Sequence, residues 1–441
     1  MIESLLVANR GEIARRVIRT ARRLGVRTIA VHSEADAGLP FVLDADEAVC
    51  LGAPQSYRDA DAILAAAKST GARAIHPGYG FLSENADFAR AVEANGLVWI
   101  GPPADAIAAM GDKINARNLM AEAGVPVAPG THDPAATVEA ALAAVEDIGY
   151  PVMVKAAAGG GGMGMAVAAD EKSLRTEYDR VRAFAERMFG DGSVLIERYF
   201  PRVRHVEVQI LGLADGRVVA LSERECSVQR RNQKLVEEAP SPAVDPPLRG
   251  RLLAAAAKAG AAVGYRNAGT VECLLDPATG EFFFLEMNTR LQVEHPITEL
   301  IHGIDLVEQQ LRIASGEPIT FDPSRKTSGH AIELRVNAED PKRFLPGPGK
   351  VATWVEPTGE GVRVDSGYAA GTTVTPHYDS LMAKLIVVGA DRDEAIAKAR
   401  AAVAGFEIVG PKNNLPFFAE LLENDEFLSG DYDTGIVSRM R

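Results

Sequence analysis

Residues 269–295 read GTVECLLDPATGEFFFLEMNTRLQVEH, and this stretch decides what the rest of the chain has to support. Two apolar runs flank a DPATG turn, a pattern that predicts a β-hairpin. Polar side chains then occupy every second position of the second strand. If the extended conformation continues, this period of two places on one face Glu286, Asn288, Arg290, Gln292 and Glu294.

Two acids of this hairpin lie between bulky apolar neighbours, Glu272 within VECLL and Glu286 within FFFLEM. Glu272 and Glu286 lie on the same face of the hairpin if the residue numbers of paired residues add up to an even number. A buried carboxylate needs a partner or a cation. With the amide oxygen of Asn288 they form a set of hard ligands suited to Mg²⁺ or Mn²⁺ bridging nucleotide phosphates. The alternative is a pair of structural acids neutralised by neighbouring side chains.

The residues that follow suit a small anion rather than a metal. Arg290 and Gln292 can hold a planar anion through hydrogen bonds, and Glu294 is a candidate general base acting on it. Each residue type alone carries little information, but the ordered set is specific.

A glycine-rich loop, GGGGMG at residues 159–164, satisfies the pattern GxGxxG. A run of glycines meets that pattern trivially, so the flanking sequence decides what kind of loop it is. Both flanks, YPVMVKA and MAVAADE, are strand-like, whereas a dinucleotide fingerprint needs a helix that begins at the glycines. The loop is therefore predicted to be a hairpin flap whose amides approach phosphates, with Lys155 on the incoming strand. A merely flexible hairpin is the alternative, and a P-loop is excluded because neither GxxxxGKS nor GxxxxGKT occurs.

The first hundred or so residues alternate short apolar runs with helical patterns such as 12–25 and 60–71. The apolar runs are ESLLVAN, RTIAVH, EAVCL, ARAIHPG and LVWIGPP. This βαβ rhythm predicts an open parallel sheet. Residues 150–310 mix hairpins and helices, and strand-rich sequence follows at 330–388.

Composition excludes several classes of partner. The 441 residues carry 47 Lys and Arg against 60 Asp and Glu, a net charge of −13, which argues against nucleic acid or an anionic membrane as the target. The cysteines Cys50, Cys226 and Cys273 have no CxxC spacing, so neither a disulfide framework nor a zinc site is expected. The N-terminus lacks a signal-peptide pattern, and the Ala-rich stretch 252–265 predicts a packed helix rather than a membrane span. A cytoplasmic protein is expected.

An arginine stripe follows one face of the predicted helix 12–25. Its members are Arg15, Arg16, Arg19, Arg22 and Arg23. A solvated or interface-facing stripe with local ion pairs is expected, with anion binding as the alternative.

Together, these segments resemble biotin carboxylase, an ATP-grasp enzyme, over nearly the whole length of the chain. The markers are VANRGEIA (7–14), HPGYGFLSEN (76–85), MGDK (110–113), the glycine flap, CSVQRRNQK (226–234), EMNTRLQVEHP (286–296) and RVNAED (335–340). The resemblance implies three domains of mixed α/β and α+β character. They are a Rossmann-like parallel sheet at 1–110, an ATP-grasp domain at 111–316 with a mobile lid at about 131–200, and a β-rich domain at 317–441.

The resemblance implies that ATP, bicarbonate and biotin react to give carboxybiotin, ADP and phosphate through carboxyphosphate. The sequence contains no biotin-attachment tetrapeptide of the Met-Lys-Met type. A stand-alone homodimeric subunit is therefore expected, working with a biotin carboxyl carrier protein and a carboxyltransferase subunit. The final acceptor is left open between acetyl-CoA, propionyl-CoA, another acyl-CoA and pyruvate.

The same resemblance implies a role for each matching residue. The residues assigned to ATP are Lys113, Lys155, Gly161 and Gly162 at the phosphates, Glu197, Arg198, Tyr199 and Phe200 at the adenine, and His205, Gln229 and Asn232 about the ribose and phosphates. Two Mg²⁺ or Mn²⁺ ions are assigned to Glu272, Glu286 and Asn288. Bicarbonate is assigned to Lys234, Arg290, Gln292 and the backbone amide of Val293. Glu294 would remove the proton of bicarbonate, and Arg335 would stabilise the biotin enolate and orient its ureido ring.

Three positions depart from the family pattern. Met163 lies in the flap where many members carry Arg or Lys, Asn232 stands where histidine is common, and Asn413 replaces a frequent threonine in GPKNN. None coincides with the acids and arginines assigned to catalysis, so an active enzyme is expected.

Two rival hypotheses predict different chemistry. An ATP-grasp ligase that activates a carboxylate for an amine shares the metal acids but has no need of RLQVEH or Arg335. A non-catalytic scaffold that retains ATP binding is free to lose its base and metal ligands, and this chain keeps both.

Overall fold

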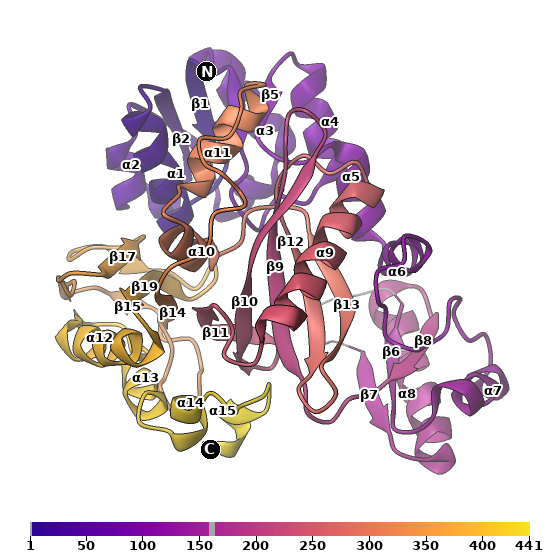
Figure 1. The fold of residues 1–441 in the computed structure, drawn as a ribbon. Coiled ribbons are helices and arrows are strands. Elements are labelled where there is room, and N and C mark those ends of the chain that lie inside the picture. The colour runs from indigo at the N-terminus through magenta and orange to yellow at the C-terminus, as the bar shows by residue number, and fades with distance from the viewer. Residues whose placement is uncertain (1, 158–163) are drawn as a thin grey trace.

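The computed structural model describes residues 2–157 and 164–441, arranged as in Figure 1. Of the positions singled out in the sequence, Gly161, Gly162 and Met163 lie outside the described residues.

The N-terminal part contains the open parallel sheet that the sequence predicts (indigo to purple in Figure 1). Its strand order is β3-β2-β1-β4-β5, and every pairing is parallel. The strands are β1 (Ser4–Val7), β2 (Arg27–Ser33), β3 (Glu47–Gly52), β4 (Ala74–His76) and β5 (Val98–Trp99). The α-helices are α1 (Gly11–Arg23), α2 (Pro40–Asp44), α3 (Ala60–Thr70), α4 (Ala86–Ala94) and α5 (Ala104–Gly111), with 3₁₀ turns η1 (Glu34–Asp36) and η2 (Pro54–Arg58). The central strand β1 is buried throughout, as its continuous apolar run requires.

The arginine stripe of α1 makes ion pairs with distant segments. Arg16 is 3% exposed, and its Nη2 lies 2.6 Å from Glu299 and 2.8 Å from Asp305. The predicted solvated position is therefore wrong for Arg16. Its partners Glu299 and Asp305 lie on distant elements, and the sequence pattern of one helix does not show which elements pack against it. The other stripe contacts are Arg15 with Asp44, Arg19 with Asp365, Arg22 with the Asp44 carbonyl, and Arg23 with Asp305 and Glu308.

A small antiparallel sheet of order β7-β6-β8 carries the glycine loop. Its strands are β6 (Val152–Ala156), β7 (Met165–Ala168) and β8 (Val194–Arg198), and the nearby helices are α6 (Lys113–Glu122), α7 (Val138–Ile148) and α8 (Glu171–Phe189). The predicted strands on both sides of the loop are confirmed, since β6 pairs with β7. Asp170 caps α8 with its side chain, as the sequence suggested.

The centre of the molecule is one eight-stranded antiparallel sheet of order β13-β12-β9-β10-β11-β14-β19-β17. Its strands are β9 (Arg204–Gly212), β10 (Val218–Arg230), β11 (Gln233–Ala239), β12 (Asn267–Asp276), β13 (Glu281–Asn288), β14 (His330–Asn337), β17 (Val362–Ser366) and β19 (Leu381–Gly389). The pairing of β11 with β14 joins strands from both sides of residue 316. Helix α9 (Pro246–Ala262) packs on β9 and β10 (Figure 1), so the Ala-rich stretch is a packed helix as predicted.

The remaining elements are coloured orange to yellow in Figure 1, and the helix Leu306–Ala314 among them packs on α1 and β12. They are α10 (His295–His302), α11 (Leu306–Ala314), β15 (Gly349–Lys350), β16 (Thr353–Val355), β18 (Thr373–Val374), α12 (Arg392–Gly405), β20 (Glu407–Val409), α13 (Leu415–Leu421), α14 (Asp425–Ser429) and α15 (Ile436–Arg439). One hydrophobic cluster joins residues of α1 and β1 to residues of β14, β19, α11 and α12, so the N- and C-terminal parts share a core. Within the described ranges, every helix is too short or too polar to cross a membrane.

Candidate active site

The predicted hairpin is formed by β12 and β13, and its register brings the two acids together. Near the turn, Asp276 pairs with Glu281 and Cys273 pairs with Phe284. The register then shifts by one residue, so that Glu272 pairs with Glu286. This irregularity is a β-bulge that leaves Leu285 as the extra residue, and bulges of this kind re-aim side chains next to active sites.

The extended conformation ends at Asn288, so the condition under which all five polar groups would share one strand face is not met. Residues 289–294 form a loop, and Glu294 directly precedes α10. The loop nevertheless gathers the predicted polar groups by folding back on the sheet. Arg290 donates from Nη2 to Asn288 Oδ1 (2.6 Å), and Gln292 donates to Glu272 Oε1 (2.8 Å).

Lys234 on β11 contacts three carboxylates and is the hub residue that joins them. Its Nζ donates to Glu207 Oε2 (2.6 Å), Glu272 Oε1 (2.8 Å) and Glu294 Oε1 (2.7 Å), which uses all the protons of one ammonium group. Burial disfavours the charged lysine, but the three carboxylates outweigh burial and raise its pKa well above the ordinary value. Lys234 is therefore a permanent cation in this arrangement.

Glu294 lies between two cations. Its Oε1 accepts from Lys234 (2.7 Å), and its Oε2 accepts from Arg335 Nη2 (3.0 Å) on β14. Burial favours the protonated acid, but Lys234, Arg335 and Arg224 together lower the pKa of Glu294 far below its ordinary value. The carboxylate is therefore ionised at neutral pH, as a general base must be, although its basicity is low while both cations touch it.

Arg335 is held in place by a second acid. Its Nε donates to Glu237 Oε1 (2.6 Å) on β11. Burial raises the pKa of Glu237 to about 7, against the opposing charge of Arg335. Arg335 thus faces Glu294, the predicted base, from a fixed position on β14.

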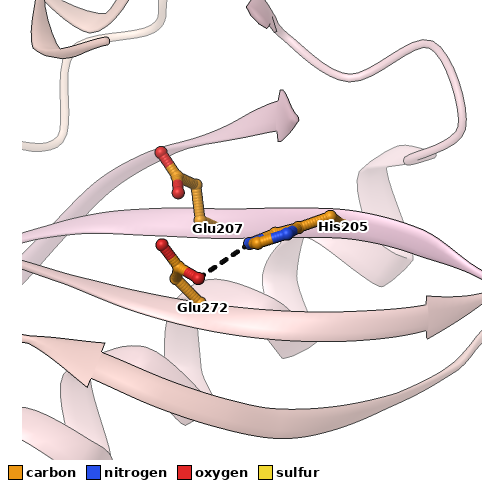
Figure 2. A group of neighbouring side chains, drawn as sticks. All are labelled: His205, Glu207 and Glu272. Atoms are coloured by element: carbon orange, nitrogen blue, oxygen red, sulfur yellow. Dashed lines mark ion pairs between the residues drawn. The ribbon is translucent and has the colours of Figure 1, made fainter. Parts of the chain in front are cut away.

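Figure 2 shows a second cluster on the adjacent strands β9 and β12, where Glu207 lies beside an ion pair between His205 and Glu272. His205 Nε2 lies 2.9 Å from Glu272 Oε2. The cluster offers ligand atoms that all lie within 4.8 Å of one another. Burial would raise the pKa of Glu272, but the charges of Lys234 and His205 lower it well below its ordinary value. Glu272 therefore stays ionised.

The predicted metal ligands fit a hard divalent ion. Glu286 lies opposite Glu272, and burial together with the charge of Glu272 raises the pKa of Glu286. Among the described residues, no hydrogen bond or ion pair engages the Glu286 carboxylate. Two opposed acids with the oxygen of Asn288 at the end of the same strand form a donor set that Mg²⁺ or Mn²⁺ prefers, and such an ion would offset the repulsion between the acids.

A cavity of about 220 Å³ opens beside these acids. Lys113, the first residue of α6, lines this cavity together with Glu286, Asn288 and Glu84. Lys113 also lowers the pKa of Glu286, which places its positive charge near that carboxylate. The structure thus brings this predicted phosphate ligand close to Glu286, a predicted metal ligand.

Lys155, Glu197 and Arg198 lie on the small sheet, and Tyr199 and Phe200 directly follow its strand β8. Lys155 Nζ is 2.5 Å from Glu197 Oε1, and Phe200 stacks on Phe283 with ring centroids 4.9 Å apart. Arg198 donates to the Ile148 carbonyl. The Tyr199 amide donates to the Pro151 carbonyl. The segment 197–200 thus connects the small sheet to the large one and is held by these hydrogen bonds.

Gln229 and Asn232 lie at the end of the β10–β11 hairpin. Gln229 is buried and pairs with Lys234, which places it at the hub. Asn232 is exposed in the two-residue turn, with φ 66°, and within the described part of the chain its side chain makes no hydrogen bond or ion pair. A positive φ of this kind is tolerated by asparagine, so the residue suits the turn whatever its contact with a ligand. Asn413 makes loop hydrogen bonds, to the Ile408 carbonyl and from the Leu415 amide.

Sequence reasoning missed several charged groups of the site. They are Glu84, Glu207, Arg224, Glu237 and Lys384. Glu207 had a detectable signal, because RHVEVQI alternates polar and apolar residues as the hairpin strand does. The others are single charges in buried strands or loops, and their role depends on which strand lies beside them.

The parallel N-terminal sheet, the small glycine-loop sheet and the acid-lined central sheet define an ATP-grasp enzyme. Residues 1–107 match the family described as the biotin carboxylase N-terminal domain, 112–321 the ATP-binding domain of the carbamoyl-phosphate synthase L chain, and 333–439 the biotin carboxylase C-terminal domain. The chain belongs to the biotin carboxylase family, which confirms the resemblance and the three-domain fold predicted from the sequence.

Individual relatives agree over the full length. Biotin carboxylase of Haemophilus influenzae is 50% identical, covering 98% of this chain and 97% of that protein. The crystal structure of a biotin carboxylase–beta-gamma-ATP complex from Campylobacter jejuni matches with a TM-score of 0.95 at 44% identity, covering 100% and 99%. The biotin carboxylase domain dimer of Hydrogenobacter thermophilus 2-oxoglutarate carboxylase, in complex with MgADP, ADP and bicarbonate, matches with a TM-score of 0.94 at 42% identity, covering 100% and 98%.

Proposed function

We propose that this chain carboxylates biotin carried on a separate protein, using ATP and bicarbonate. The observation that carries the proposal is the Glu294 carboxylate, held ionised between Lys234 and Arg335. A ligase that joins a carboxylate to an amine needs the opposed metal acids, but it does not need a base placed between two cations. Membership of the biotin carboxylase family supports the same reaction.

In the first step, bicarbonate binds among Arg290, Gln292, Lys234 and the amide of Val293. Its negative charge competes for the cations around Glu294, so the carboxylate regains basicity when the substrate arrives. The O–H bond of bicarbonate breaks, its proton moves to Glu294, and the freed oxygen attacks the γ-phosphorus of ATP. The bond from that phosphorus to the β–γ bridging oxygen breaks, which releases ADP and leaves carboxyphosphate.

In the second step, carboxyphosphate breaks between its carbon and the oxygen shared with phosphorus, giving CO₂ and phosphate. The phosphate takes the N–H proton of the biotin ureido group, and the nitrogen attacks CO₂. Arg335 pairs with the negative charge that develops on the ureido oxygen and orients the ring. Its contact with Glu237 fixes the guanidinium for this role.

The nucleotide and metal assignments in the proposal are those that the family resemblance implies. Lys113, Lys155, Gly161 and Gly162 bind the phosphates, 197–200 binds adenine, and His205, Gln229 and Asn232 lie about the ribose and phosphates. Glu272, Glu286 and Asn288 hold two Mg²⁺ or Mn²⁺ ions, which when bound neutralise phosphate charge during transfer. The shared cavity of Lys113 and Glu286 supports this arrangement.

The partners follow from the reaction. The proposal includes a biotin carboxyl carrier protein, a carboxyltransferase partner, a homodimeric state, a cytoplasmic location and a lid at about 131–200 within the central domain 111–316. An acetyl- or propionyl-CoA carboxylase is the proposed complex, with a pyruvate-carboxylase-type complex as the alternative. The alternative is supported by a 43% identical structure described as the biotin carboxylase subunit of pyruvate carboxylase.

The test is ADP release by the purified chain, measured with and without bicarbonate and free biotin. We expect ADP release to require bicarbonate and to rise with biotin. Turnover that is independent of biotin and needs an amine would favour the amine-ligase hypothesis, and nucleotide binding without turnover would favour the scaffold. Either result would overturn the proposal.

A further inference from the structure

A fully buried lysine, Lys384 on β19, lies behind the loop that carries the proposed base. Its Nζ donates to the carbonyl oxygen of Val293 (2.9 Å) and lies 3.1 Å from Glu12 Oε2 and 4.0 Å from Asp365 Oδ2. The side chain is 0% exposed. A buried ammonium group is costly unless it is paired and hydrogen-bonded, so this placement calls for a physical reason.

The two acids around Lys384 are themselves held in place. Glu12, on α1, accepts a hydrogen bond from the Tyr79 hydroxyl through its other oxygen. Asp365, on β17, is bound by Arg363 (2.6 Å) and Arg19 (2.9 Å). The ammonium group is therefore fixed by elements of the N-terminal and C-terminal parts, and it reaches the loop from a rigid support.

The loop is anchored through two successive carbonyl groups. Lys384 holds the carbonyl of Val293, which shares a planar peptide with the amide of Glu294. His295 contacts the carbonyl of Gln292 through Nδ1 (2.7 Å), and that peptide carries the Val293 N–H. In the described part of the chain, no acceptor bonds the Val293 N–H. The carbonyl oxygens of Gln292 and Val293 thus point to protein donors. The N–H of Val293 stays available to an anion.

We propose that Lys384 is a positioning residue that sets the orientation of the Val293–Glu294 peptide, and through it the bicarbonate contact and the aim of the base. Lys384 itself does not touch the substrate. The inference rests on the proposed function. The competing explanation is that Lys384 only neutralises the buried Glu12.

The two explanations differ in what happens when both charges are removed. Lys384→Met removes the donor and leaves Glu12 unpaired, whereas Glu12→Gln/Lys384→Met removes the pair together. Glu12→Gln keeps the donor to Val293 and serves as the matched control. Lys384→Arg keeps the charge but moves the donor atoms. For each variant, bicarbonate-dependent ADP release gives the KM for bicarbonate and for ATP, and circular dichroism with ADP binding reports the fold.

We expect Lys384→Met and the double variant to raise the KM for bicarbonate about tenfold or more, the effect of losing one charged hydrogen bond. The KM for ATP is expected to change less than about twofold, because Lys384 contacts none of the proposed nucleotide residues that the structure describes. Lys384→Arg is expected to fall between the wild type and Lys384→Met, and Glu12→Gln is expected to keep the KM for bicarbonate.

A double variant or a Lys384→Arg variant with the wild-type KM for bicarbonate would overturn the positioning role. An equal rise in both KM values would also overturn it, because that pattern is the mark of general structural damage. If the wild-type chain shows no bicarbonate-dependent ADP release, the proposed function fails instead. The wild-type measurement therefore separates the two failures.

Discussion

Glu272 pairs with Glu286 across β12 and β13 because the strand register shifts by one residue at Leu285. Counted from the turn, where Asp276 pairs with Glu281, an unbroken register would set Glu272 opposite Leu285. The bulge therefore decides that the two acids meet. Lys234 and His205 offset the charge of Glu272, but among the described residues no hydrogen bond or ion pair engages Glu286, so this relationship favours a metal-binding role.

The metal role predicts a specific defect for Glu286→Gln. Removing one of two opposed carboxylates weakens attraction for Mg²⁺ but relieves repulsion of Glu272, so the fold is expected to survive. We expect the Mg²⁺ concentration for half-maximal ADP release to rise about tenfold or more, as for the loss of one charged ligand. Titration of ADP release with Mg²⁺ measures this shift. An unchanged Mg²⁺ requirement would contradict the assignment.

The base role predicts that Glu294→Gln abolishes biotin-dependent ATP cleavage. Glutamine keeps the shape and one acceptor oxygen, for either Lys234 or Arg335, but it has no carboxylate to take a proton. A loss of about 10²–10⁴-fold is expected for a general base. ATP binding, measured by isothermal titration calorimetry, should persist because Lys113 and Lys155 are untouched. Turnover close to the wild-type rate would refute the role.

The bicarbonate role predicts that Arg290→Ala raises the KM for bicarbonate while ATP binding survives. Arg290 donates to Asn288 Oδ1 (2.6 Å) and Glu84 Oε2 (2.8 Å), and its loss removes the charge proposed to hold the anion. A rise of about tenfold or more is expected from a charge-assisted contact. Arg180→Ala is the matched control, since Arg180 is an exposed residue of α8 that pairs with its helix neighbour Glu177. An equal rise in the KM for bicarbonate in both variants would contradict a bicarbonate-binding role for Arg290.

Glu237 predicts a pH dependence of stability. Burial raises the pKa of its carboxyl to about 7, so the folded protein holds a proton that the unfolded chain releases near its ordinary value of 4.5. Between about pH 5 and 7 the folded state therefore binds more protons, and stability falls as pH rises by up to ~1.4 kcal/mol per pH unit from this group. Glu237→Gln should remove that component. Denaturant unfolding at pH 5, 6 and 7 measures the difference between the two proteins, and parallel curves would contradict it.

The sequence predicted the local features well, because each is encoded within a few neighbouring residues. The parallel strands, the hairpin at 269–288 and the cap at Asp170 follow from short-range periodicity and capping chemistry. The predicted catalytic cluster lies close together for the same reason, since Arg290, Gln292 and Glu294 occupy one short loop. The structure corrects how they converge, through a loop rather than a continued strand.

The unpredicted features depend on pairing between distant segments. The bulge at Leu285 is invisible in sequence, because the alternation of residues does not say where a register shifts. Lys384 and Val293 lie 91 residues apart, and nothing in either local pattern points to the other. The burial of Arg16 likewise follows from the packing of α1 against α10 and α11, which periodicity on one helix cannot show.

The most direct test follows labelled bicarbonate through the reaction. The purified chain is incubated with ATP, Mg²⁺, free biotin and bicarbonate carrying ¹³C and ¹⁸O, and carboxybiotin, ADP and phosphate are measured. We expect ¹³C in carboxybiotin and one ¹⁸O in each phosphate, because the bicarbonate oxygen that attacks ATP stays on phosphorus when carboxyphosphate breaks. ADP release with no ¹³C in biotin, or with phosphate free of ¹⁸O, would contradict it.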